Sequence, residues 1–267
     1  LDTAIDCYDG DGQIRINITG DSNGDGLNQN YTYTLTGTDY NGNAVSTSVE
    51  TTALNYKFTP KAGTYTVKVT DANGCPKISD EITLTQPDAT LAVTGTETNL
   101  TCNGANDGAI DLSVTGGTPN YTYAWTKDGD NTYSATSQDV ENLTPGTYNV
   151  TVTDANGCPD TANFTITEPD ELIATGTLSD NNGFGISCNG ANDGAIDLSV
   201  TGGTPNYTYA WTKDGDNTYS ATSQDVENLT PGTYNVTVTD ANGCPDTANF
   251  TITEPDELIA TGTLSDN

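Results

Sequence analysis

The sequence contains no histidine and no methionine, and its seven Lys and Arg residues face 37 Asp and Glu residues. Histidine is the commonest general base and a frequent metal ligand in enzymes, so its absence argues against catalysis. A formal net charge of −30 excludes nucleic-acid binding through phosphate neutralisation and disfavours anionic membranes. We therefore expect no enzyme, and we expect cations, neutral glycans or other surfaces as partners.

Long apolar runs are also missing. The sequence contains no run of about 18 apolar residues, the length needed to span a bilayer, so we expect no membrane insertion of this fragment. Leu1 does not begin a signal peptide, which predicts an internal part of a longer exported chain.

Bulky apolar residues are scarce but regularly placed. Leu, Ile, Val and Phe make up 45 of the 267 residues, a low share that together with high charge is typical of disorder. The apolar residues nevertheless alternate with polar ones over short runs bounded by Gly, Pro and Asn, as in half-buried strands. Ile110, Leu112 and Val114 share one face of such a run. The spacing therefore predicts a folded β protein.

The sequence is rich in repetition. Residues 102–181 recur without a change at 188–267, and a diverged third copy runs from Cys7 to Cys75. A period of about 86 residues indicates a tandem array. We predict an all-β fold of three tandem immunoglobulin-like β-sandwich repeats, with six or seven strands each, forming an elongated rod. The predicted ranges are 1–87 for the diverged repeat, 88–170 and 171–256 for the other two, and 257–267 for the first strand of a further repeat.

Local phrases predict how each sandwich is fixed. Asn156-Gly157 has the residue types of a type I′ hairpin turn. Trp125 and Trp211 alternate with tyrosines, which predicts core positions rather than sugar-binding platforms. A Gly-Thr-Tyr phrase resembles a tyrosine corner, in which the phenol hydroxyl bonds to upstream backbone. The tyrosines concerned are Tyr65, Tyr148 and Tyr234.

Six cysteines, two in each copy, lack the spacing of zinc sites and predict three disulfides in an exported chain. Pairing within a copy would join Cys7 to Cys75, Cys102 to Cys158 and Cys188 to Cys244, each bond contributing roughly 4 kcal/mol. The two cysteines of a copy should, however, lie at opposite ends of a sandwich, about 25 Å apart. The alternative joins neighbouring copies, Cys7 to Cys158 and Cys102 to Cys244, and leaves Cys75 and Cys188 for other copies.

Two regions could hold a hard cation, although no cofactor is expected to be required. Asp21, Asn23 and Asp25 match the first half of an EF-hand loop, but Thr32 stands at the twelfth position and no helices flank it. The choice there is between a looser calcium loop and a solvated turn. A second calcium site could form where neighbouring repeats meet. Its candidate ligands are Asn106, Asp107, Glu168, Asp170, Glu171, Asp240 and Asn242.

Three phrases of the repeat, at 102–110, 116–125 and 146–158, resemble SprB repeats, the tandem modules of large surface adhesins in gliding bacteria. The phrases are Cys-Asn-Gly-Ala-Asn-Asp-Gly-Ala-Ile, Gly-Gly-Thr-Pro-Asn-Tyr-Thr-Tyr-Ala-Trp and Gly-Thr-Tyr-Asn-Val-Thr-Val-Thr-Asp-Ala-Asn-Gly-Cys. The resemblance covers nearly all of the second and third copies. The first copy departs from it at Tyr8-Asp9, in an inserted loop after Gly20, and at Leu35.

The resemblance implies type IX secretion, display at the cell surface as filaments, and attachment to a substratum during gliding. It also implies that Asp-Thr-Ala triplets could be O-glycosylated at Thr3, Thr161 and Thr247. We therefore expect a structural and adhesive segment of a large secreted cell-surface filament, with neighbouring repeats, surface glycans or a solid substratum as partners. The alternative is a spacer or a carbohydrate-binding module of a large secreted polysaccharide-degrading enzyme.

Overall fold

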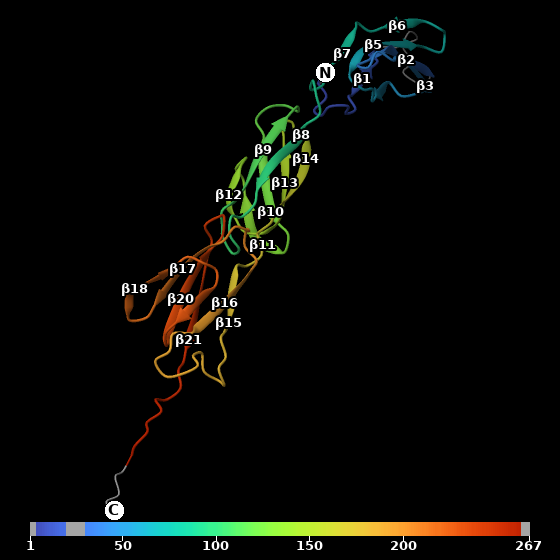
Figure 1. The fold of residues 1–267 in the computed structure, drawn as a ribbon. Helices are drawn as coiled ribbons and strands as arrows, with labels where there is room; N and C mark the ends of the chain where they lie inside the picture. Colours follow the sequence, from blue (N-terminus) through green and yellow to red (C-terminus); the bar gives the residue numbers. More distant parts are fainter. Residues whose placement is uncertain (1–3, 20–29, 263–267) are drawn as a thin grey trace, which may run out of the picture. The chain divides into compact units, whose positions relative to one another are not determined.

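The computed structural model describes residues 4–19 and 30–262, and the regular elements of that part of the chain are all strands (Figure 1). The all-β prediction is therefore confirmed. In these two ranges there is no helix with the length and apolar character needed to cross a membrane.

Seven strands lie within the described residues of each of the three repeat ranges. Those of the first repeat are β1 (Ile14–Asn17), β2 (Tyr31–Asp39), β3 (Ala44–Thr51), β4 (Asn55–Phe58), β5 (Gly63–Thr70), β6 (Pro76–Ile78) and β7 (Ile82–Leu84). Those of the second are β8 (Ala92–Thr98), β9 (Gly108–Thr115), β10 (Thr122–Lys127), β11 (Asp130–Ala135), β12 (Val140–Leu143), β13 (Gly146–Thr153) and β14 (Pro159–Ile166). Those of the third are β15 (Ile173–Leu178), β16 (Gly194–Thr201), β17 (Thr208–Lys213), β18 (Asp216–Ala221), β19 (Val226–Leu229), β20 (Gly232–Thr239) and β21 (Pro245–Ile252).

The second and third repeats share one strand order. The three-stranded sheets run β12-β9-β8 and β15-β16-β19, and the four-stranded sheets run β11-β10-β13-β14 and β18-β17-β20-β21. Such sheets form sandwiches of the immunoglobulin and fibronectin type III kind. The predicted fold class, about three such sandwiches in tandem, is confirmed.

The first repeat has a smaller second sheet. Strand β1 pairs with β4, while the larger sheet runs β3-β2-β5-β6 and β7 also pairs with β5. The single last strand of the other repeats is divided here at Ser79. The Ser79 hydroxyl accepts a hydrogen bond from Val67 N at 2.9 Å, where an unbroken ladder would use a backbone carbonyl.

Contacts divide the chain into two compact units. The first comprises Leu1–Thr96, Ile110–Val140 and Thr147–Phe164, and the second comprises Glu97–Ala109, Glu141–Gly146 and Thr165–Asn267. The strands of the second repeat are shared between the units. Each unit contains one segment where two repeats meet.

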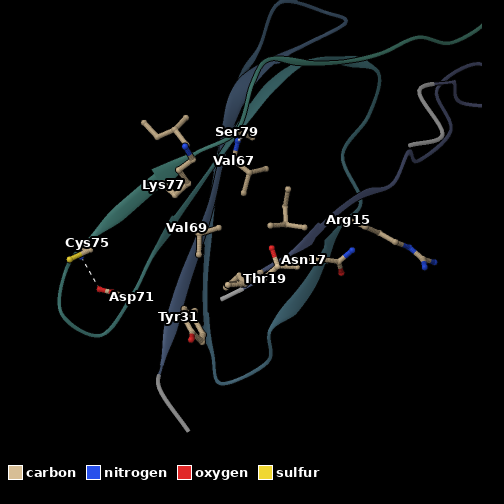
Figure 2. A pocket seen from close by; sticks show the side chains of 13 residues that line it. Arg15, Asn17, Thr19, Tyr31, Val67, Val69, Asp71, Cys75, Lys77 and Ser79 are labelled. Atoms are coloured by element: carbon tan, nitrogen blue, oxygen red, sulfur yellow. Dashed lines mark hydrogen bonds between the residues drawn. The ribbon is translucent and has the colours of Figure 1, made fainter. Parts of the chain in front are cut away.

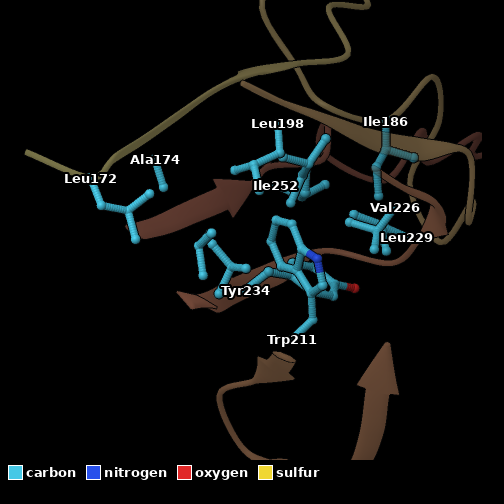
Figure 3. Packing of buried hydrophobic residues seen from close by; sticks show 12 residues of the cluster. Leu172, Ala174, Ile186, Leu198, Trp211, Val226, Leu229, Tyr234 and Ile252 are labelled. Carbon is cyan, nitrogen blue, oxygen red and sulfur yellow. The ribbon is translucent and has the colours of Figure 1, made fainter. Parts of the chain in front are cut away.

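Alternation of side chains along paired strands builds the cores, as in the third repeat. Strand β17 pairs with β20 so that Trp211 lies opposite Val236 and Tyr209 opposite Val238. Trp211 is 1% exposed, and its indole Nε1 donates to Ser223 O at 3.0 Å. Figure 3 shows its ring in the middle of the apolar cluster, which includes Leu198, Val226, Tyr234 and Ile252. Trp125 is equally buried, so both tryptophans are core residues as predicted.

The tyrosine corners are present. Tyr65 donates its hydroxyl hydrogen to Lys61 O at 3.0 Å, and Tyr234 donates to Thr230 O at 2.9 Å. Both hydroxyls bond to upstream backbone, as predicted, at a residue four positions earlier, and Tyr148 is buried to the same extent as Tyr234. Burial raises the pKa of Tyr65, which keeps the phenol protonated as a donor.

The prediction of a type I′ turn at Asn156-Gly157 is wrong. Within this described hairpin only Gly157 has a positive φ, of 88°. Gly157 N donates to Asp154 O and Asp154 N donates to Cys158 O, each at 3.0 Å. These bonds define a three-residue loop, residues 155–157, in which a turn is followed by a left-handed glycine. The Asp154 side chain favours this loop because it accepts hydrogen bonds from Asn156 N and Cys158 N.

The segment after the third repeat differs from its sequence twin. Residues 257–262 repeat the sequence of residues 171–176, and no strand forms over these six described residues. Leu258 is 95% exposed, whereas its equivalent Leu172 is 8% exposed beside β16. The expected further strand is therefore not formed over these residues.

Candidate functional site

The most distinctive feature of the chain is a pair of disulfides that join neighbouring repeats. Cys7 is bonded to Cys158 and Cys102 to Cys244, with Cα atoms 5.7 Å apart in each pair. The pairing between neighbouring copies is confirmed, whereas the within-copy pairing and a third disulfide within this chain are wrong. Cys75 and Cys188 are free thiols, and both are exposed.

The topology of a sandwich explains why cysteines of one copy do not pair. Cys188 precedes β16, and Cys244 lies in the hairpin between β20 and β21. The eight residues of β16 alone extend over roughly 27 Å, so these two positions lie at opposite ends of the repeat. A disulfide needs Cα atoms within about 7 Å, which a neighbouring repeat provides at both bonds.

One side of each junction is a hairpin that a buried aspartate organises; we call it the closing hairpin. In the third repeat it comprises residues 240–244. Asp240 Oδ1 accepts hydrogen bonds from Asn242 N at 2.9 Å and Cys244 N at 2.8 Å, and Oδ2 accepts one from Thr204 N at 2.8 Å. Asp154 makes the same three bonds in the second repeat. The cysteine that follows is therefore held rigidly.

These hydrogen bonds set the protonation of the buried carboxylates. The N–H of Thr204 lowers the pKa of Asp240, with burial opposing it and further N–H groups of the hairpin reinforcing it. For Asp154, burial raises the pKa, but four backbone N–H groups outweigh it and the pKa lies below its ordinary value. Both carboxylates are therefore charged at neutral pH, and neither has a salt-bridge partner among the described residues.

The other side of each junction is a turn that begins at the first cysteine of a repeat; we call it the opening loop. In all three repeats the cysteine carbonyl accepts a hydrogen bond from the backbone N–H three residues later in the chain, at 3.0 to 3.1 Å. The second residue after each cysteine has a positive φ; these residues are Asp9, Gly104 and Gly190. The departure at Tyr8-Asp9 thus leaves the turn unchanged.

A side chain from the end of each repeat holds the opening loop. Glu168 Oε2 accepts from Gly104 N and Glu254 Oε2 accepts from Gly190 N, both at 2.7 Å. In the first repeat Gln86 Oε1 accepts from Asp9 N at 3.0 Å. The loop is also anchored in the core, because the residue two positions before each opening cysteine is buried. These residues are Ile5, Leu100 and Ile186.

The two sides meet in the same way at both disulfides. Asn156 Nδ2 donates to Asp6 O at 2.9 Å, and Cys158 Sγ lies 3.3 Å from the same carbonyl oxygen. Asn242 Nδ2 donates to Thr101 O at 3.0 Å, and Cys244 Sγ lies 3.4 Å from that oxygen. A covalent bond and an amide hydrogen bond therefore fix each closing hairpin to the opening loop of the preceding repeat.

The candidate calcium ligands at the junction include several hydrogen-bond acceptors of the two loops, and calcium binding there stays a prediction. The described residues contain no group of three or more acidic, Cys or His side chains that could hold a metal ion. Asp107 accepts hydrogen bonds from Thr101 N and Oγ1, and the Thr101 hydroxyl lowers the pKa of Asp107. Asp170 O accepts from Gly203 N, while Asn106 and Glu171 are exposed. Among the candidate carboxylates, those of Asp107, Glu168 and Asp240 accept backbone N–H groups of the loops.

The other candidate residues are scattered. Asp21, Asn23 and Asp25 lie outside the described residues, as does Thr3. Thr161 and Thr247 are exposed on β14 and β21. The aspartate of each of these two triplets has a structural role, since Asp160 Oδ2 accepts from Val93 N and Asp246 Oδ2 from Ala174 N.

The first repeat also contains an open pocket of about 650 Å³ between β1, β5 and β6 (Figure 2). Its lining combines apolar side chains such as Tyr31, Val67 and Val69 with the polar side chains of Arg15 and Lys77. The pocket exists where the four-residue strand β1 replaces the eight-residue strands β9 and β16 of the other repeats.

Two stretches of the chain, residues 94–130 and 186–216, match the SprB repeat family. The chain carries SprB repeats. Each match contains an opening loop and the strand that follows it, β9 or β16. The SprB repeats and the two disulfides are those of an extracellular surface protein, and no catalytic domain is identified. No curated protein matches the chain.

Several solved structures with more than one domain match the chain. Extracellular domains 3–5 of Drosophila OTK are 15% identical, with 92% of this chain and 93% of that chain covered and a TM-score of 0.31. The FN1–FN3 domains of chicken CNTN1 are 14% identical, with 93% and 96% covered and a TM-score of 0.29. Domains A168–A170 of titin are 15% identical, with 93% and 95% covered and a TM-score of 0.29. The fold assignment of the SprB repeats rests on their own strand order.

Sequence reasoning placed the cysteines but missed the groups that orient them. The signal was present in the phrase Asp-Ala-Asn-Gly-Cys, which ends all three copies. An aspartate four residues before a cysteine can accept that cysteine's backbone N–H, as Asp154 and Asp240 do.

Proposed function

We propose that this chain is a load-bearing, adhesive segment of a large cell-surface filament used for attachment and gliding motility. The SprB match and the disulfides of an extracellular protein support this proposal. The SprB resemblance further favours export by type IX secretion and attachment to surface glycans or a solid substratum. Many repeats of weak individual affinity would give firm attachment through effective concentration.

The observation that carries the proposal is the overlap of the two disulfide loops. One loop runs from Cys7 to Cys158 and the other from Cys102 to Cys244, so residues 102–158 belong to both. When the two ends are pulled apart, the force follows the shortest covalent path. This path goes from Cys7 through the first disulfide to Cys158, back along the chain to Cys102, and through the second disulfide to Cys244. The first and third repeats lie outside this shortest covalent path.

The overlap limits how far the chain can be stretched. Between Cys7 and Cys244 the covalent path is the stretch 102–158, which at about 3.4 Å per residue reaches roughly 190 Å. Without disulfides the path is the whole of residues 7–244, which reaches roughly 800 Å. Unfolding of a repeat under load would therefore release little length, which suits a filament that must transmit tension.

Single-molecule stretching of the chain by its two ends tests the proposal. We expect the oxidised protein to reach a limit about 600 Å shorter than the reduced protein. Equal limiting lengths in the two states would contradict a load-bearing role for the disulfides. A variant with Cys75 and Cys188 both replaced by Ser is the matched control, since it should behave as the unmodified chain in both states.

A second candidate function, carbohydrate binding, is favoured by the pocket of the first repeat. Its volume of about 650 Å³ and its mixture of apolar and polar lining are typical of small-ligand sites. Binding of the chain to a glycan array, with loss on Arg15→Ala and Lys77→Ala, would support a carbohydrate-binding role. No binding to any glycan would remove this candidate and leave the load-bearing proposal intact.

A further inference from the structure

Cys75 and Cys188 are the unpaired counterparts of cysteines that form junctions elsewhere in the chain. Cys75 ends the closing hairpin of the first repeat, as Cys158 and Cys244 end those of the other two. Cys188 begins the opening loop of the third repeat, as Cys7 and Cys102 begin those of the other two. Each free thiol therefore belongs to one half of a junction, and the two disulfides of the chain show how such a junction is completed.

The opening loop of Cys188 already has the conformation of a paired loop. Ser187 N donates to Asp193 Oδ1 at 3.1 Å, Asn189 Nδ2 donates to Pro255 O at 3.1 Å, and Gly190 N donates to Glu254 Oε2 at 2.7 Å. Equivalent bonds hold the loop of Cys102, which is disulfide-bonded. The loop is thus formed before any partner is bound.

The closing hairpin of Cys75 is formed in the same way. Asp71 Oδ1 accepts from Asn73 N at 2.9 Å and from Cys75 N at 2.8 Å, and the second of these contacts joins the two residues in Figure 2. Gly74 has a φ of 83°, close to the 88° of Gly157 and Gly243. What differs is exposure, since Cys158 and Cys244 are 7% exposed and Cys75 is exposed.

We propose that the opening loop of Cys188 is a socket for the closing hairpin of another SprB repeat, and that the hairpin of Cys75 fits such a socket. Within this chain the two halves match each other, so a second copy supplies a suitable partner for each. In that junction the amide of Asn73 takes the place of the Asn242 amide and donates to Ser187 O. The inference rests on the junction geometry and not on the proposed function.

The bond forms by thiol–disulfide exchange with a disulfide oxidant such as oxidised glutathione. Cys75 first exchanges with glutathione disulfide and releases one reduced glutathione. The Cys188 thiolate then attacks Sγ of Cys75, the Cys75–glutathione bond breaks, and a second reduced glutathione leaves. The two electrons and two protons of the protein thiols end on glutathione.

Two single variants of the full chain test the socket. Cys75→Ser leaves Cys188 as the free thiol, and Cys188→Ser leaves Cys75. The two are mixed in equal amounts in a glutathione redox buffer containing about 0.3 M salt, which screens the repulsion between acidic chains. Disulfide-linked dimers are then identified by peptide mass spectrometry, which also verifies that the Cys7–Cys158 and Cys102–Cys244 bonds are intact.

Random pairing of the two thiols would give about half of the dimers as the mixed Cys75–Cys188 species. We expect the mixed species to make up most of the dimers. Asn73→Ala, introduced into the Cys188→Ser chain, should return the mixed species to about half, whereas the matched change Asn41→Ala in another exposed turn should not. A random distribution, an absence of mixed dimers, or an excess that Asn73→Ala leaves unchanged would overturn the proposal.

Discussion

At the scale of single residues, the aspartate of the closing hairpin connects the core of its repeat to the junction. Asp240 is 5% exposed and accepts three backbone hydrogen bonds, so its carboxylate replaces the water that these N–H groups would otherwise bind. A buried N–H group left without an acceptor costs about 1–3 kcal/mol. The residue therefore couples the stability of the repeat to the position of Cys244.

We expect Asp240→Ala to lower the free energy of unfolding of the third repeat by about 2–4 kcal/mol, because it removes the acceptor of three N–H groups. Urea unfolding would be followed through Trp211 fluorescence in a Trp125→Phe background, which leaves one tryptophan. Asp197→Ala, an exposed change on β16, should cost at most about 0.5 kcal/mol. Equal effects of the two substitutions would show that the hydrogen bonds contribute nothing.

The same carboxylates predict an acid-sensitive stability. The pKa values of Asp154 and Asp240 are lowered in the folded protein, so folding favours their charged forms. Their contribution is complete above the ordinary aspartate pKa of about 3.9 and is lost as the pH falls through the lower folded values. The melting temperature should therefore fall on acidification, and the difference between wild type and Asp240→Asn should shrink below about pH 4. A difference that stays constant from pH 7 to pH 3 would argue against this linkage.

At the scale of elements, the hairpin between β20 and β21 links strand register to the junction. Thr239 lies opposite Pro245 in the ladder, so a three-residue loop places Cys244 directly at its end. The loop depends on Gly243, whose φ is 88° and around which a Cβ would meet no neighbouring atom. Only backbone strain, and no clash, distinguishes this glycine from alanine.

We expect Gly243→Ala to destabilise the third repeat by about 1–2 kcal/mol, the cost of a left-handed conformation for a residue with a Cβ. The measurement is again urea unfolding followed through Trp211. Gly262→Ala is the matched control, because its φ lies outside the left-handed region and open space surrounds it. The expectation fails if both substitutions leave the unfolding midpoint unchanged.

At the scale of the whole molecule, the two disulfides act together because their loops overlap. The Cys7–Cys158 bond bypasses the first repeat, and the Cys102–Cys244 bond bypasses the third. In the chain-entropy treatment, each loop of this size restricts the unfolded chain by about 5 kcal/mol. The overlap adds a mechanical consequence that neither disulfide has alone.

Variants with one disulfide should therefore show intermediate stretching limits. With Cys102→Ser and Cys244→Ser, the path between Cys7 and Cys244 becomes the stretch 158–244, roughly 290 Å. With Cys7→Ser and Cys158→Ser it becomes the stretch 7–102, roughly 320 Å. Both values lie between the roughly 190 Å of the oxidised chain and the roughly 800 Å of the reduced chain. Single-molecule stretching of the four species would refute the crossed path if either variant matched the intact chain.

The strands, the repeats and the cores follow from the sequence alone. The alternation at Ile110, Leu112 and Val114 appears as one face of β9, and Trp125 and Trp211 are buried as their spacing predicts. These features depend on residues close in the chain, because strand periodicity and the tyrosine corners involve neighbours only a few positions apart. The same reasoning could not fix the type of turn at Asn156-Gly157, where the Asp154 side chain decides.

The partners of groups far apart in sequence depend on how the chain folds in three dimensions. In the folded chain Cys7 is bonded to Cys158, Glu168 accepts a hydrogen bond from Gly104 N, and Leu258 is exposed where its twin Leu172 is buried. Identical residues behave differently because a disulfide, a hydrogen bond or a buried strand needs a second surface within a few ångströms. The sequence of one repeat contains half of each such contact, and the arrangement of its neighbours provides the other half.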